Sequence, residues 1–287
     1  MDAQGDEGLL LVPGFVGPDE RVAVLDWLSG LEPLWEQRFS TVRPPPPGEA
    51  QRPLLRPVYW LGNWQFACLD YYHPPLGVKD RCVAAEPFPP VLQAWVDRVA
   101  DLVRARLPAA MVPRGWVLNT CLVNFYGDKT VDGRRVDTAR VGDHRDFEPG
   151  PVASVSLGER AFFQFVDKRG QALRNCWLED GALQVFAGPR WKDRAFHRVP
   201  RVERRGTPAL PPEIAGFTTR RVNFTFRFVP PGAVVPFAAL GAQAQADVRG
   251  YVEILARRAP FWAAALAEAG PAEAPSGLSR TAFPAPG

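Results

Sequence analysis

The feature that most constrains the fold of this sequence is a succession of short, largely apolar runs between residues 117 and 228. The runs are VLNTCLVNFY, VASVSL, AFFQFV, CWLEDGALQVF and RVNFTFRFV, and they are separated by Gly, Pro and Asp. Each run has the length of a β-strand, and several strands at such spacing are typical of a β-sandwich or β-barrel. The sequence therefore predicts one mostly β core.

Helices are predicted on either side of this β-rich part. Apolar side chains recur at helical spacing in residues 17–31 and 88–107, and residues 7–16 read as an entry strand. Consecutive prolines in residues 43–53 cannot join regular structure, so we expect an exposed loop there. Beyond residue 236 the sequence is Ala-rich and predicts a helix followed by a frayed tail. The side of the first helix expected to be buried carries Val22, Val24, Leu25, Leu28 and Leu31.

Composition narrows the function only slightly. A net charge of +3 is too small to indicate a partner, and 46% hydrophobic residues is ordinary for a globular protein. Arg dominates among the 34 cations, which fits either bidentate contacts to carboxylate and phosphate or a GC-rich genome. The sequence has no CxxC pair, no secretory signal and no long apolar run. We therefore expect free thiols, a cytoplasmic location, no membrane partner and no obligate protein partner.

The run RRVNFTFRFV, residues 220–229, shows the clearest alternation in the chain. Successive side chains of a strand leave opposite faces, so Phe224 and Phe226 belong to one face and Arg221 and Arg227 to the other. The aromatic face belongs to a core. The polar face either lines a site or is the solvated face of an edge strand.

Two of the three histidines stand in a pattern that suits a metal. His144 precedes Asp146 by two residues, so both side chains share a face of an extended segment, and His197 follows later. Two imidazoles and one carboxylate leave coordination positions open, which is typical of non-haem Fe(II) oxygenases. Such an enzyme needs an electron-donating co-substrate, and the far carboxylate of 2-oxoglutarate needs a cation such as Arg221. An isolated HxD is also frequent by chance, as a loop His beside a solvated Asp.

Taken in order, these segments resemble the AlkB-type 2-oxoglutarate and Fe(II)-dependent dioxygenases. The matching sequence motifs are LVNFYGD, GDHRDFEP, VASVSLGERAFFQF, LEDGALQVFAG, FHRV and RRVNFTFR, across roughly residues 117–228. The R-x-N-x-T-x-R strand is the most specific of them. The resemblance implies a double-stranded β-helix (jelly-roll) core of about 117–230 with flanking helices, preceded by a lid and helical part of about 1–116. Residues 237–287 would form a C-terminal extension to this 1–236 dioxygenase domain.

The resemblance also implies a role for particular residues. His73 is expected to be structural or solvated. The segment YWLGNWQFACLDYYHPP is expected to form the substrate pocket and its lid. By position, Fe(II) would be held by His144, Asp146 and His197, which are also the catalytic residues; 2-oxoglutarate by Asn124, Tyr126, Arg221, Asn223 and Arg227; and the substrate by Glu148, Trp64, Tyr71 and Tyr72.

The implied reaction uses Fe(II), 2-oxoglutarate and O2 to demethylate N-alkylated nucleobases of DNA or RNA, releasing formaldehyde, succinate and CO2. The base would be flipped out or come from a single strand. Alternatives are the same chemistry on a protein side chain or small metabolite, and an inactive binding module. The insertions at 129–141 and 203–220 leave the substrate open. Phosphate contacts are expected from Arg190, Lys192, Arg194, Arg198, Arg201, Arg204 and Arg205, unless these form a solvated loop.

Overall fold

The computed structural model describes residues 7–37, 54–65 and 82–271. The helices are α1 (Pro18–Ser29), α2 (Pro90–Arg106), α3 (Ala242–Leu255) and α4 (Pro260–Ala269). The strands are β1 (Leu9–Val12), β2 (Val58–Leu61), β3 (Asn63–Gln65), β4 (Cys82–Ala84), β5 (Thr120–Val131), β6 (Arg134–Asp137), β7 (Val141–His144), β8 (Val152–Gly158), β9 (Ala161–Val166), β10 (Ala172–Leu178), β11 (Leu183–Phe186), β12 (Phe196–Val202), β13 (Phe217–Arg227) and β14 (Val234–Val235). The expected loop at 43–53 and the expected tail at 274–287 lie outside the described residues.

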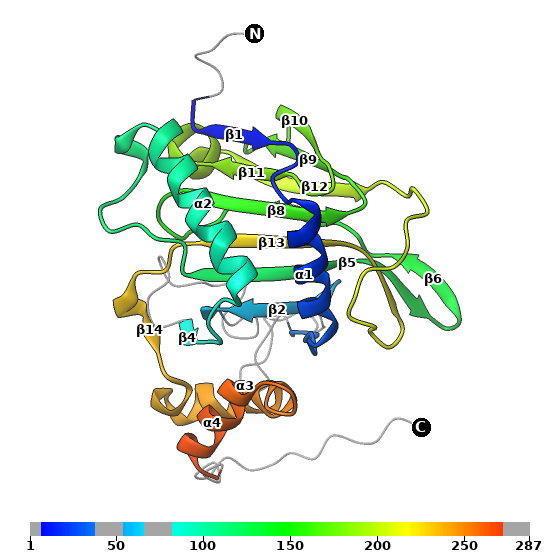
Figure 1. Ribbon diagram of the computed structural model, residues 1–287, viewed down its shortest axis with the longest axis vertical. Coiled ribbons are helices and arrows are strands. Elements are labelled where there is room, and N and C mark those ends of the chain that lie inside the picture. Colours follow the sequence, from blue (N-terminus) through cyan, green and yellow to red (C-terminus); the bar gives the residue numbers. More distant parts are fainter. Residues whose placement is uncertain (1–6, 38–53, 66–81, 272–287) are drawn as a thin grey trace.

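The described strands form a larger sheet, a smaller facing sheet and a short third sheet (Figure 1). The larger sheet has the order β1-β11-β8-β13-β5-β2, with β6 paired to β5. The smaller sheet has the order β10-β9-β12-β7, and the third has the order β14-β4-β3. Apart from the parallel pair β14–β4, the paired strands are antiparallel. Strands from distant parts of the chain lie side by side, as expected for the predicted jelly-roll core.

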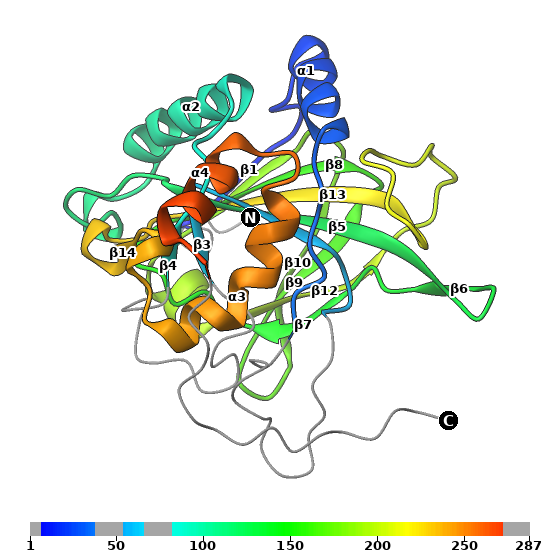
Figure 2. The same ribbon diagram turned by 90° about the horizontal axis from the view of Figure 1, so that it is seen from below.

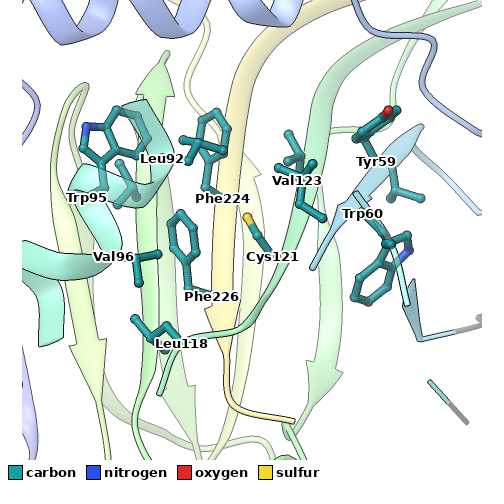
Figure 3. Close-up of a cluster of buried hydrophobic side chains, with 14 of the residues drawn as sticks. Tyr59, Trp60, Leu92, Trp95, Val96, Leu118, Cys121, Val123, Phe224 and Phe226 are labelled. Atoms are coloured by element: carbon teal, nitrogen blue, oxygen red, sulfur yellow. The ribbon is translucent and has the colours of Figure 1, made fainter. Parts of the chain in front are cut away.

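Helices α1 and α2 lie over one face of the larger sheet (Figures 1 and 2). The aromatic face of β13 packs against α2, where the Phe224 and Trp95 rings meet edge to face with centroids 5.4 Å apart (Figure 3). Phe226 meets Phe88 in the same geometry at 5.9 Å. The alternation in the sequence thus placed this face correctly. On α1 the prediction was wrong for Val22, which is 68% exposed, whereas Leu28 is fully buried.

The other face of β13 is directed into the space between the larger sheet and the smaller facing sheet. Asn223 accepts a hydrogen bond from Ser154 of β8, and Arg221 donates one to Ser156 of the same strand. Phe163 and Phe165 of β9 contribute to an apolar cluster in this space. The polar residues of β13 are therefore interior, and the alternative of a solvated edge strand is wrong, because β13 pairs with both β5 and β8.

The C-terminal helices pack against the same core and not apart from it. The Trp262 ring of α4 and the Tyr251 ring of α3 both meet Trp64 of β3, with centroids 5.7 and 6.0 Å away. The Tyr251 hydroxyl also accepts a hydrogen bond of 2.9 Å from the backbone N–H of Gln37. None of the described helices is both long and apolar enough to cross a membrane.

Candidate metal and co-substrate site

The predicted metal ligands come together at the edge of the smaller sheet. His144 ends β7 and stands directly opposite His197 of β12 in the antiparallel register, with ring centroids 4.1 Å apart. Asp146 follows β7 two residues later. One ligand atom from each of the three residues can be chosen so that all lie within 4.8 Å of one another. Cross-strand pairing thus joins residues that are far apart in the sequence.

Hydrogen bonds leave one free ligand atom on His144 and one on Asp146. Nδ1 of His144 lies 2.9 Å from the carbonyl oxygen of Gly142. A carbonyl can only accept, so Nδ1 carries the proton and Nε2 keeps its lone pair. Oδ1 of Asp146 accepts from Nε and Nη2 of Arg227 at 2.9 and 2.8 Å. Oδ2 is buried with no hydrogen-bond partner among the described residues, as a metal ligand would be before the ion binds.

The electrostatics favour the protonation states that a metal needs. Burial and the neighbouring His144 lower the pKa of His197 to about 3, although Asp146 opposes this. Burial also lowers the pKa of His144. For Asp146, burial raises the pKa, but nearby positive charge, first of all that of Arg227, outweighs it and holds the pKa below its usual value. Near neutral pH the site therefore offers neutral imidazoles and an ionised carboxylate, which is the set that binds a divalent cation.

Arg221 forms a second centre, deeper between the sheets and 1% exposed. Its Nη2 donates to Ser156 Oγ at 2.8 Å and to Asn223 Oδ1 at 2.6 Å. Its Nε and Nη1 have no hydrogen-bond partner within the described part of the chain. The guanidinium lies 4.9 Å from the ring centroid of Tyr126. A buried cation with two free donors fits the carboxylate of an anionic co-substrate.

Arg227 and Glu148 lie beside the metal ligands. Nε of Arg227 is 3.7 Å from Oε2 of Glu148, and burial raises the pKa of that carboxyl group while Arg227 opposes it. Oε2 of Glu148 has no hydrogen-bond partner among the described residues, although the side chain is only 2% exposed. Arg227 thus orients Asp146 and leaves Glu148 with an unused acceptor next to the metal ligands.

One predicted substrate contact needs correction. Trp64 is 1% exposed and its indole N–H donates to Oε1 of Glu36 at 2.5 Å. Its ring lies among Tyr251 and Trp262, so it has no free face on which a base could stack. The predictions for Tyr71, Tyr72 and His73 lie outside the described residues.

The predicted phosphate contacts divide into two groups. Arg198 pairs with Asp143, Arg204 pairs with Asp128, and Arg205 pairs with Glu203. Arg201 lies over the Phe162 and Trp177 rings, and Lys192 is buried. These five side chains therefore do not form a continuous track of free cations for phosphates. Arg190 and Arg194 are exposed and form no ion pair within the described residues.

Three site residues were not identified by sequence reasoning. Arg56 donates from Nε to Oδ1 of Asn124 at 2.7 Å, and Lys192 is close enough to lower the pKa of Asp146 electrostatically. Gln65 lies beside Glu148, but its Nε2 forms no hydrogen bond among the described residues. Arg56 lies outside the recognised motifs and Lys192 was assigned to phosphate, whereas Gln65 lies in the segment YWLGNWQFACLDYYHPP, which was expected to form the substrate pocket. For Arg56 and Lys192, neither the neighbouring residues nor their spacing along the chain indicated a place near the site.

A jelly-roll core with two imidazoles and one carboxylate at its sheet edge, and a buried arginine beyond them, is the arrangement typical of a non-haem iron oxygenase. The family model for the 2OG-Fe(II) oxygenase superfamily matches residues 8–227, so the chain belongs to that superfamily. The prediction of a 2-oxoglutarate and Fe(II)-dependent oxygenase is confirmed at the level of this superfamily. No curated protein matches the chain. Among solved structures, OsALKBH1 is 20% identical over 77% of this chain and 98% of its own, with a TM-score of 0.46.

The chain is therefore a dioxygenase that uses Fe(II), 2-oxoglutarate and O2. The residues present fit these groups. Oδ2 of Asp146 lies 3.5 Å from Nε2 of His197 and has no hydrogen-bond partner among the described residues, so these atoms, together with His144, suit a divalent cation. Nε and Nη1 of Arg221, which also have no hydrogen-bond partner in the described part of the chain, suit a carboxylate.

Proposed function

We propose that this enzyme removes N-alkyl groups from nucleobases of DNA or RNA by oxidation. The observation that carries the proposal is the buried Glu148, whose Oε2 lies 3.7 Å from Arg227 and accepts no hydrogen bond among the described residues, next to the candidate metal ligands. Bases alkylated at ring nitrogens such as N1 of adenine or N3 of cytosine are cationic, and they also present an amino group. An acceptor-only carboxylate is complementary to both features.

In this proposal His144, Asp146 and His197 hold Fe(II), and Arg221 binds the far carboxylate of 2-oxoglutarate. When bound, the ferrous ion with 2-oxoglutarate and O2 supplies the oxidising chemistry that hydroxylates a C–H bond. A hydroxymethyl group on a base nitrogen then breaks down to formaldehyde and the unmodified base.

The chain's own residues orient these partners. Arg227 keeps one oxygen of Asp146 occupied and so directs the other toward the ion. Asn124, Tyr126 and Asn223 complete the surroundings of the co-substrate. Glu148 accepts a hydrogen bond from the amino group of the base and offsets its positive charge. The rings of Phe163 and Phe186, 5.6 and 5.1 Å from that of His197, restrict water near the imidazole.

The strand that carries the base would be held by a groove beside the turn that leads to His197. The groove has a volume of about 680 Å³, and its lining includes Lys168, Arg190 and Arg194 as well as apolar side chains. Glu7 and Asp167 also line it, but Oδ1 of Asp167 already accepts from backbone N–H groups of its own turn. Cations next to apolar surface suit a single strand, which presents phosphates and bases together.

The central experiment measures formaldehyde released from oligonucleotides that contain 1-methyladenine or 3-methylcytosine, with Fe(II), 2-oxoglutarate and O2 present. We expect release above that from the unmodified oligonucleotide, and loss of release in Glu148→Ala. Succinate formation with a protein or metabolite substrate, and no formaldehyde from any methylated oligonucleotide, would instead support hydroxylation of another substrate class.

The groove is tested by the salt dependence of single-strand binding. Three phosphate contacts contribute a slope of about 2 in a plot of log affinity against log salt. A variant with Ala at Lys168, Arg190 and Arg194 should lose this slope. A control with Ala at Arg104, Arg134 and Arg257 removes the same charge from α2, β6 and the segment after α3, and should keep it. Equal losses in both variants would leave only nonspecific attraction.

A further inference from the structure

Arg56 lies just before β2 and contacts two residues of the proposed co-substrate pocket. Its Nε donates to Oδ1 of Asn124 at 2.7 Å, and its guanidinium lies 5.1 Å from the ring centroid of Tyr126. Arg221 approaches the same ring at 4.9 Å. Asn124 and Tyr126 are two residues apart on β5 and so share a face, opposite Asn223 and Arg221 of β13.

The contact to Arg56 determines how the Asn124 amide is oriented. An amide offers an acceptor oxygen on one side and a donor nitrogen on the other, and a guanidinium can only donate. Oδ1 must therefore face Arg56, which turns Nδ2 in the other direction. Asn124 is 3% exposed, and within the described part of the chain its Nδ2 makes no hydrogen bond. A donor is thus available on a buried side chain.

The orientation matters because 2-oxoglutarate carries only acceptor oxygens at neutral pH. An amide with Nδ2 toward the pocket attracts it, whereas a flipped amide would place two acceptors against each other. We propose that Arg56 is a positioning residue for the co-substrate, which fixes the Asn124 amide so that Nδ2 donates to 2-oxoglutarate. The inference rests on the proposed role of Asn124 in the pocket and does not depend on the identity of the oxidised substrate.

Arg56 could instead act by attracting the dianion directly, and a double-mutant cycle separates the two. The measurement is calorimetric titration of Mn(II)-loaded protein with 2-oxoglutarate, in which no turnover takes place. Arg56→Met keeps a long side chain near the Tyr126 ring but removes the donor. We expect it to weaken binding about tenfold, the value of one hydrogen bond to a charged group. In an Asn124→Ala background, which is itself weakened, the same change should cost less than about twofold.

Two further variants sharpen the result. Arg56→Lys retains a group that can only donate, so it should recover binding to within about threefold of the unmodified chain. Arg134→Ala removes an exposed cation of β6 and should leave binding unchanged. Among the described residues Arg56 makes no hydrogen bond to a candidate metal ligand, but its charge acts on His144. Mn(II) affinity is therefore measured for each variant, and 2-oxoglutarate is titrated at saturating Mn(II), so that a change in metal binding does not contribute to the cycle.

Equal weakening by Arg56→Met in both backgrounds would overturn the inference, because Arg56 would then act without Asn124. Unchanged binding in Asn124→Ala would overturn it together with the role of Asn124. Absence of formaldehyde from methylated oligonucleotides, combined with the expected cycle, would refute the proposed substrate alone and leave the role of Arg56 supported.

Discussion

Replacing Arg221 by Met should hardly change the stability of the ligand-free chain, although the residue is 1% exposed. An uncompensated buried charge costs about 3–5 kcal/mol. Its two hydrogen bonds, to Ser156 and Asn223, return about 1.5–3 kcal/mol each because the donor is charged. The two amounts nearly cancel, and Asn223 Oδ1 keeps a second donor in Ser154. We therefore expect a change within about 2 kcal/mol.

Arg227 provides the matched comparison, since it lies on the same strand and face and is 6% exposed. It pairs with Asp146 and lies 3.7 Å from Glu148. Arg227→Met leaves buried carboxylates uncompensated, and such a loss costs about 3–5 kcal/mol. For a chain of this size we expect the melting temperature to fall by about 6–20 °C, compared with less than about 8 °C for Arg221→Met.

Binding of 2-oxoglutarate should respond strongly to Arg221→Met. Removing one partner of a buried, hydrogen-bonded charge pair costs about 2–5 kcal/mol, so the Kd should rise by about 30-fold to a few thousand-fold. Thermal denaturation and calorimetry of the Mn(II)-loaded protein measure both quantities. If Arg221→Met lowers the melting temperature as much as Arg227→Met does, Arg221 has an internal structural partner and the reasoning is refuted.

Three other perturbations follow from the same geometry. His144→Ala and Asp146→Ala should each weaken Mn(II) binding and abolish succinate formation; normal values in either would remove that residue from the site. The folded pKa of His197, about 3 against 6.5 for the unfolded chain, means that the unfolded state binds more protons below pH 6.5. Stability should then fall from pH 6.5 toward 3 by at most about 1.4 kcal/mol per pH unit, and urea midpoints at pH 5 and 7 should differ less in His197→Gln. Trp262→Ala should cost about 3–5 kcal/mol in urea unfolding by opening a cavity beside Trp64; a loss below 1 kcal/mol would contradict this.

The sequence alone predicted the site correctly where the periodicity of a strand determines the direction in which its side chains point. Alternation along β13 placed Phe224 outward and Arg221 inward, because each residue of a strand reverses the face. The HxD spacing likewise places His144 and Asp146 toward one point. The pairing of His197 with His144 depends on the register between β12 and β7, and only the order of family motifs indicated it.

The predictions from the sequence were wrong where a side chain pairs with a residue far away in the chain, or where a segment is uniformly aromatic or uniformly charged. In the aromatic segment around Trp64, the amino-acid sequence does not distinguish the side chains directed toward α4 from those directed toward the site. Arg205 pairs with the neighbouring Glu203, but the acids that neutralise Arg198 and Arg204 come from distant parts of the chain. Arg204, for example, reaches Asp128, 76 residues away. A cluster of charges in the sequence therefore overstated the free positive surface.

The packing of α4 on β3 has a consequence for how variation in this enzyme should be interpreted. Trp64 rests against Trp262, while the next residue, Gln65, lies beside Glu148. A single peptide unit thus connects the C-terminal helices to the carboxylate proposed to recognise the base. Substitutions in α4, remote from every proposed ligand, should alter substrate preference while leaving iron and 2-oxoglutarate affinity intact. In related enzymes with another residue at the position of Trp262, we expect the preferred alkylated base to differ while the oxidation reaction itself is retained.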